Sequence, residues 1–226
     1  MKKFAIIVAG GKGIRMGNDI PKQFLLLHGK PILMHSIEQF YKYDNAISII
    51  VVLPMFQFDF WANLCKTHNF SINHQIIAGG DQRFNSVRNG LDFISEINSV
   101  TAIHDGVRPL VTIETINRCF NTALKEGNAV PSINVVDSIR MIKTNGNEVA
   151  NRDNVRLIQT PQTFQTKILK EAYNQPWNSN FTDDATVIES IGYKINLVEG
   201  NIENIKITSP TDLKIAEVLL NKEQMV

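Results

Sequence analysis

The sequence has few cysteines and no long apolar run. Its two cysteines, Cys65 and Cys119, lie in separate helix-like stretches, and neither belongs to a Cys-x-x-Cys pair or a cysteine–histidine cluster. This pattern argues against a zinc site and favours free thiols in a reducing compartment, so we expect a cytoplasmic protein. No segment approaches the roughly 18 apolar residues of a membrane span, so no membrane partner is expected.

The chain also lacks a dominant charge. It carries 23 lysines and arginines against 22 acidic residues, a formal net charge of +1. A near-neutral protein has no overall field that would attract nucleic acid, although a local basic pocket remains possible. The 226 residues, 43% of them hydrophobic, are typical of one large globular domain spanning 1–226.

Short apolar runs alternate with longer segments of helical periodicity. Strands without polar alternation indicate a sheet covered on both faces, and the repeated strand–helix order predicts a mostly parallel, doubly wound α/β sheet. We expect strands at 4–9, 46–54, 74–80, 99–109, 128–136 and 193–200. We expect helices at 31–43, 56–68, 81–94, 112–127, 165–174, 183–191 and 210–221.

This order is interrupted by a polar segment at about 134–158. The segment alternates with period two, and Asn145-Gly146 predicts a hairpin turn. An isolated two-stranded ribbon is marginal in water, so we expect an inserted β-arm that packs on a second subunit.

The loop after the first strand reads "GGKGIRMG" and is followed by "PKQF". A dinucleotide fingerprint fails because Met16 stands at the third glycine, and a Walker A loop fails because no Ser or Thr follows a Gly-Lys pair at the required place. The loop still offers backbone N–H groups beside Arg15 and Lys22, which suits a triphosphate. A tight strand–helix connection with solvated charges is the plainer interpretation.

The stretch "AGGKGIRMG…PKQF" resembles the N-terminal signature of the nucleotidyltransferases that act on sugar and polyol phosphates. With six further segments in order, the chain resembles the 2-C-methyl-D-erythritol 4-phosphate cytidylyltransferase family of the non-mevalonate isoprenoid pathway. These segments are "GGDQRFNSV" (79–87), "HDGVRP" (104–109), "VVDSI" (135–139), "QTPQTF" (159–164), "TDDA" (182–185) and "VEGNIENIKITSPTDL" (198–213).

The resemblance implies a Rossmann-like fold and the transfer of a cytidylyl group from CTP to methylerythritol phosphate with release of pyrophosphate. It assigns the catalytic charges to Arg15, Lys22 and Lys206, and Mg²⁺ to Asp105. It further implies a homodimer in which each arm reaches the partner's site.

The resemblance also assigns binding residues. Those for CTP are Ala9, Gly10, Gly11, Lys12, Gly13, Gly80, Asp81, Ser86, Asp105 and Gly106. Those for the polyol phosphate are Asp105, Ser138, Arg152, Thr160 and Lys206. Arg83 and Arg108 are expected to be structural braces, His104 to pack near a strand end, and Asp212 to cap the last helix. The family commonly has two alanines at Gly106-Val107 and threonine at Ser138.

Plainer structural roles remain open for several of these residues. Asp105 could cap a loop, Ser86 could lie on a helix surface, and Arg152 could be an ordinary arm charge. Two other functions also remain open. A ribitol-5-phosphate cytidylyltransferase shares the opening motif, and a non-catalytic nucleotide-binding protein could share the fold.

Overall fold

A computed structural model describes residues 1–11 and 20–223 of the chain. Its centre is one large sheet with the strand order β10-β7-β11-β6-β1-β4-β5, and β12 pairs with β7. The strands are β1 (Lys2–Val8), β4 (Ser48–Leu53), β5 (Gln75–Ala78), β6 (Ser99–Asp105), β7 (Asn128–Asn134), β10 (Arg156–Ile158), β11 (Gln162–Gln165) and β12 (Leu197–Glu199). Strand pairs β1–β4, β1–β6, β4–β5 and β7–β12 are parallel. The prediction of a mostly parallel α/β sheet is therefore confirmed.

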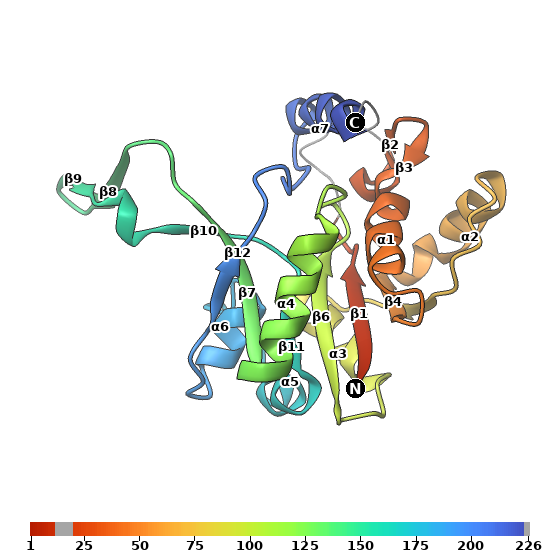
Figure 1. Cartoon of the computed structure of the whole chain (residues 1–226), viewed down its shortest axis with the longest axis horizontal. Helices are drawn as coiled ribbons and strands as arrows, with labels where there is room; N and C mark the ends of the chain where they lie inside the picture. Colours follow the sequence, from red (N-terminus) through yellow and green to blue (C-terminus); the bar gives the residue numbers. More distant parts are fainter. Residues whose placement is uncertain (12–19, 224–226) are drawn as a thin grey trace.

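Alternate residues of the central strands enter two separate cores, which is why these strands are apolar on both faces. Ala5 and Ile7 of β1 belong to one core, and Phe4 and Ile6 belong to the other. Helices α1 (Ile32–Tyr43), α2 (Phe58–Thr67) and α4 (Ile113–Glu126) supply the first core. Helices α3 (Arg83–Asp92), α5 (Thr166–Tyr173) and α6 (Asp184–Glu189) supply the second. The sheet is thus doubly wound (Figure 1).

Local signals in the sequence set the ends of helix α4. The Thr112 side chain accepts a hydrogen bond from the Thr115 amide and caps the helix, and Gly127 ends it with a φ of 92°. The helix predicted at 112–127 is confirmed, and its last turn ends at Gly127.

The segment after the hairpin returns to the sheet in an unexpected direction. Strand β11 lies between β6 and β7 and is antiparallel to both, and β10 is antiparallel to β7. The sequence pattern does not predict β10 and β11 as sheet strands, because each is short and its pairing partners are distant in sequence. The short strands β2 (Leu26–Leu27) and β3 (Lys30–Pro31) were also missed for their brevity.

The predicted hairpin is present as β8 (Ile139–Lys143) and β9 (Gly146–Ala150), and it extends away from the body of the molecule (Figure 1). We call residues 135–155, which connect β7 to β10, the arm. The predicted turn is wrong by one residue, because Lys143 pairs with Gly146 and leaves Thr144 and Asn145 at the tip. Gly146 instead supplies the left-handed conformation just after the tip, with a φ of 128°.

Helix α7 (Pro210–Glu223) lies near β2 and β3, at the end of the molecule opposite the N-terminus (Figure 1). It contributes Ala216 to a third, smaller core with Leu27, Val107 and Ile207. Asp212 caps it as expected, by accepting from the Thr208 and Ser209 amides at 2.8 Å. Among the described helices, none has the length and apolarity needed to cross a membrane.

Candidate active site

A cleft of about 220 Å³ lies at the carboxyl ends of β1, β5 and β6. Ligands of doubly wound sheets bind at this edge. Strand pairing brings the loops together, since Val8 of β1 is in register with Asp105 of β6. The described lining residues are Val8, Ala9, Gly10, Gly11, Lys22, Gln23, Gly80, Asp81, Gln82, Arg83, Ser86, Asp105, Val107 and Lys206.

The first wall of the cleft is the start of the glycine loop. A Cβ atom on Gly11 would lie 3.3 Å from Cε and 3.9 Å from Nζ of Lys22, so the lysine side chain lies against the loop backbone. Gln23 fixes the loop from beneath, because its side-chain amide donates to the Ala9 carbonyl at 2.8 Å and to Gln57 at 3.0 Å. The Lys22 ammonium group therefore lies beside the backbone of Gly11.

The second wall is the turn that precedes α3. Ser86 is 4% exposed, and its hydroxyl accepts from the Gly80 amide at 3.1 Å, so it is not a helix-surface serine. A Cβ atom on Gly80 would lie 2.4 Å from Cβ of Asn85, a distance that side chains do not tolerate. Glycine is thus required at position 80, because a side chain there would prevent the turn from packing against the first turn of α3.

Asp105 is the carboxylate at the centre of the cleft. Its oxygens lie 2.8 Å from Lys206 Nζ, 3.4 Å from Arg83 Nε and 3.7 Å from Arg108 Nε. Burial alone would raise its pKa, but the charges of Arg83, Lys206 and Arg108 hold the pKa well below its ordinary value. Asp105 is therefore ionised at any physiological pH.

Lys206 reaches the cleft from near the end of the chain. The Ile207 amide donates to the Val107 carbonyl at 2.9 Å, and Ile207 enters the third core. Because side chains alternate along an extended segment, Lys206 points the other way, toward Asp105. The apolar residues on either side of Lys206 therefore hold its ammonium group over the site.

Arg108 and Arg83 act as braces in this structure. Arg108 donates to the Asn204 carbonyl at 2.7 Å and joins the Asp105 loop to the segment that carries Lys206. Arg83 makes a bidentate pair with Asp184, with donor–acceptor distances of 2.9 and 2.7 Å. Arg108 thus contacts both the Asp105 carboxylate and a backbone carbonyl.

His104 and Thr160 lie beneath the Asp105 loop. The Thr160 hydroxyl accepts from the Asp105 amide and bonds to His104 Nδ1, both at 3.0 Å, while His104 Nε2 lies 3.0 Å from the Arg108 carbonyl. Burial lowers the pKa of His104 to about 4, so the ring is neutral, as its packed position requires. Thr160 is 5% exposed and lies outside the described cleft lining, so here it positions Asp105.

Some of the expected binding residues are not brought to this cleft. Ser138 and Arg152 lie on the exposed arm, and Arg152 donates to the Val136 carbonyl at 2.5 Å. Gly106 faces the core, where a Cβ atom would lie 2.9 Å from Leu33, so its small size serves packing. Lys12, Gly13 and Arg15 lie outside the described residues.

Several contributors were missed by sequence reasoning. Gln23 and Gln82 line the cleft, and Asp184 anchors Arg83 from beneath it. The motifs "PKQF", "GGDQRF" and "TDDA" contain these residues, but nothing in a motif says which of its members points inward. The tertiary structure is needed to show which residues of each motif point into the cleft.

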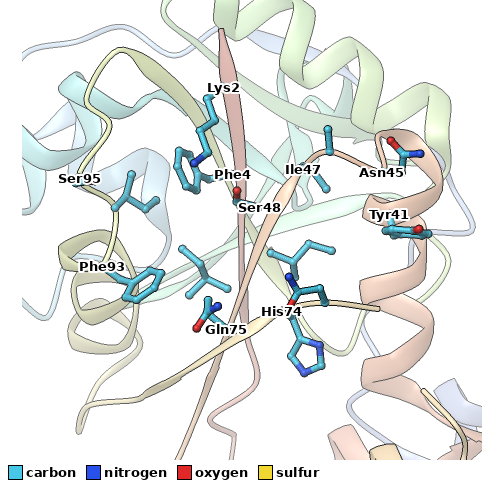
Figure 2. A pocket seen from close by; sticks show the side chains of 15 residues that line it. Lys2, Phe4, Tyr41, Asn45, Ile47, Ser48, His74, Gln75, Phe93 and Ser95 are labelled. Atoms are coloured by element: carbon cyan, nitrogen blue, oxygen red, sulfur yellow. The ribbon is translucent and has the colours of Figure 1, made fainter. Parts of the chain in front are cut away.

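A larger hollow, of about 480 Å³, lies at the opposite edge of the sheet, at the amino-terminal ends of β1, β4 and β5 (Figure 2). Among its described lining residues, Lys2 is the one lysine or arginine, and its ammonium lies 5.0 Å from the Phe4 ring centroid. A triphosphate needs several cations and backbone donors. The smaller cleft is therefore the better candidate for a triphosphate site, because it carries the cations and lies at the carboxyl ends of the strands.

The donor set of the cleft fits a magnesium ion shared with a nucleotide. Mg²⁺ prefers oxygen ligands and is held in nucleotide sites by one or two carboxylates, waters and phosphates. Asp105 supplies one ionised carboxylate, and the described residues contain no group of three or more metal-binding side chains. Asp105 would hold the ion together with the phosphates. Lys206 would then release the Asp105 carboxylate oxygen with which it is paired.

A doubly wound sheet with Gly10, Gly11, Lys22, Lys206 and Asp105 lining one cleft points to the nucleotidyltransferase class. The chain belongs to the 2-C-methyl-D-erythritol 4-phosphate cytidylyltransferase family, whose model matches residues 4–222. The assignment made from the sequence motifs is confirmed.

Relatives and solved structures agree with this assignment. A 2-C-methyl-D-erythritol 4-phosphate cytidylyltransferase of Bacteroides thetaiotaomicron is 50% identical, over 97% of this chain and 100% of that protein. One from Alkaliphilus oremlandii is 39% identical over 97% of this chain and 95% of the relative. The crystal structure of the Thermus thermophilus cytidylyltransferase has a TM-score of 0.79 at 28% identity, with 98% and 100% of the two chains covered.

Proposed function

We propose that the protein transfers the cytidylyl group of CTP to 2-C-methyl-D-erythritol 4-phosphate. A phosphate oxygen of the polyol attacks the α-phosphorus of CTP, the bond to the β-phosphate oxygen breaks, and pyrophosphate leaves. The observation that carries the proposal is the meeting of Lys22, Asp105 and Lys206 in one cleft of a chain that belongs to this family.

The chain's residues would act by positioning and charge. The attacking phosphate is already ionised at neutral pH, so no general base is needed. This agrees with the state of His104, which is neutral, buried and hydrogen-bonded on both ring nitrogens. Lys22, together with Arg15 of the glycine loop, would stabilise charge on the α-phosphate, and Lys206 would hold the polyol phosphate.

The glycine loop and the turn before α3 would hold CTP. Backbone groups of Gly10, Gly11 and the following Lys12 and Gly13 suit the phosphates. Gly80, Asp81 and Ser86 would contact the cytosine and ribose. Asp105 would hold Mg²⁺, which supplies charge neutralisation on the phosphates when bound.

The arm would complete the polyol-phosphate site in a second subunit. Arg152 and Arg156 line a hollow of about 320 Å³ at the base of the arm, a setting suited to a phosphate. Within one chain neither residue lines the described cleft. We therefore propose a homodimer in which Ser138 and Arg152 serve the partner's cleft. The unpaired Cys65 and Cys119 are compatible with the cytoplasm, where we place the enzyme.

A direct assay tests the proposed function. Purified protein is incubated with CTP, Mg²⁺ and either methylerythritol 4-phosphate or ribitol 5-phosphate, and pyrophosphate release is measured. We expect turnover with the first substrate and removal of activity by a chelator. Faster use of ribitol 5-phosphate would overturn the substrate, and CTP binding without turnover of any polyol phosphate would indicate a non-catalytic protein.

A further inference from the structure

Beneath the cleft, a row of hydrogen bonds links α5, α6 and α3 to Asp105. The Tyr173 hydroxyl donates a hydrogen bond to Asp184 at 2.6 Å, and the Asp184 carboxylate also accepts hydrogen bonds from both terminal nitrogens of Arg83. Arg83 then reaches Asp105 through Nε alone, at 3.4 Å. We call Tyr173, Asp184 and Arg83 the buried relay.

The relay is rigidly held. Asp184 is 0% exposed, and the ring of Tyr173 stacks on Phe84 with centroids 4.7 Å apart. The start of α6 is fixed to β11, because Gln162 donates to Asp183 and accepts from the Ala185 amide, both at 2.8 Å. These contacts hold the Asp184 carboxylate facing Arg83.

The Arg83 guanidinium forms stronger hydrogen bonds with Asp184 than with Asp105. Asp184 takes the planar fork in the bidentate geometry that makes arginine–carboxylate pairs strong. Asp105 receives one long contact from Arg83, lines the cleft, and has its other oxygen 2.8 Å from Lys206 Nζ. Among residues 1–11 and 20–223, Asp105 is the other carboxylate paired with Arg83, so the fork would turn toward Asp105 if Asp184 were absent.

We propose that Asp184 is a positioning residue that keeps the guanidinium of Arg83 from capturing Asp105, so that this carboxylate stays available to the nucleotide-bound cation. Tyr173 orients Asp184 in the same role. Neither residue lines the described cleft, so neither touches a substrate there. The inference rests on the proposed function, because it concerns the cation that accompanies CTP.

The test uses Asp184→Asn, which removes the charge and one acceptor of the fork at nearly constant volume. Partners that orient a metal ligand change metal affinity by about 10–100-fold when altered. We expect Mn²⁺ to bind the protein–CTP complex about tenfold more weakly, as measured by paramagnetic resonance. In turnover assays the half-saturating Mg²⁺ concentration should rise by about the same factor, and excess Mg²⁺ should restore kcat to within about threefold of the unaltered protein.

Tyr173→Phe and Asp183→Asn complete the design. Tyr173→Phe keeps the ring stack and removes one hydrogen bond, so we expect a shift of about threefold in the same direction. Asp183→Asn removes the same charge from the neighbouring residue and one acceptor of Gln162, but it keeps the Arg83–Asp184 pair and the bond from the Ala185 amide to Gln162. Asparagine still caps α6, so Mn²⁺ affinity should stay within about twofold.

Unchanged Mn²⁺ affinity in Asp184→Asn, whatever its melting temperature, would overturn the proposal and leave Asp184 a structural residue. If that variant does not fold, Tyr173→Phe decides in the same way. The outcome is separable from the proposed function. An unaltered protein that binds CTP and Mn²⁺ without turnover would contradict the function alone, because the binding titration still tests the relay.

Discussion

The body and the arm of this protein are built on different principles. In the body, Ile50 of β4 is 1% exposed within a core that both strands and helices supply. In the arm, Ile142 of β8 is 82% exposed, and among the strands that the structure describes β8 pairs with β9 alone. A two-stranded ribbon without a core of its own is marginally stable in water, so we expect the arm, unlike the body, to need a second surface.

The same difference separates the two halves of the expected site. The cleft residues of the body are fixed by one another, as Asp105 shows with Arg83, Arg108 and Lys206. Ser138 and Arg152 of the arm are exposed. Binding residues on an exposed ribbon gain a defined position only when the ribbon is packed against a partner.

The largest expected effect comes from mixing two inactive variants. Lys22→Ala damages the body's part of the site and Arg152→Ala damages the arm's part, so each alone should lose about 100-fold or more in kcat/KM. In a mixture, half of the dimers are mixed, and in each of them one site combines an intact body with an intact arm. We therefore expect about a quarter of the activity of the unaltered protein.

Two controls accompany this experiment. The mixed dimers are verified by native mass spectrometry, and the two variants are also assayed separately at the same total concentration. Verified mixed dimers that stay inactive would show that Arg152 does not serve the partner's site.

A matched pair of isoleucine truncations compares the two regions in stability. Ile50→Ala opens a cavity in the body and should lower the free energy of unfolding by about 2–5 kcal/mol at every protein concentration. Ile142→Ala should weaken self-association instead, so its effect on unfolding should shrink as the protein is diluted. Denaturant titrations over a range of concentrations measure both. A concentration-independent loss from Ile142→Ala equal to that from Ile50→Ala would make the arm part of the monomer's own core.

A smaller effect concerns acid stability, which we assign to the body because residues 135–155 contain no histidine. His104 has a folded-state pKa of about 4, and an unfolded histidine has one near 6.5. On acidification the unfolded state therefore binds the proton first. The contribution of neutral His104 to the free energy of unfolding is present in full above about pH 6.5 and is lost progressively down to about pH 4. It amounts to about 3 kcal/mol.

Urea titrations between pH 7.5 and 4.5 measure this loss, with His104→Gln as the comparison. The variant should start less stable, because it loses imidazole hydrogen bonds, but it should lose less stability on acidification. Parallel pH dependence in the two proteins would contradict the assignment to His104. His35 and His74, whose pKa values burial also lowers, account for the acid sensitivity that the variant retains.

The parts that sequence reasoning found share a local cause. Apolar runs and helical periodicity report burial within a few residues, so β1, β4, β6 and the helices between them were predicted. The pairing of β11 between β6 and β7 was not, because a four-residue strand has no pattern that names its neighbours. The hairpin was found, yet its turn was placed one residue late, because Gly146 is required after the tip and not in it.

By itself the sequence determined the α/β class, the glycine loop at its first strand and the family. Each of these depends on residue types at short, fixed spacings. Only the tertiary structure decided that Arg83 divides its guanidinium between Asp184 and Asp105, which enter from α6 and β6, 101 and 22 positions along the chain from Arg83. Such contacts depend on how elements pack across the sheet, and local pattern carries no information about that packing.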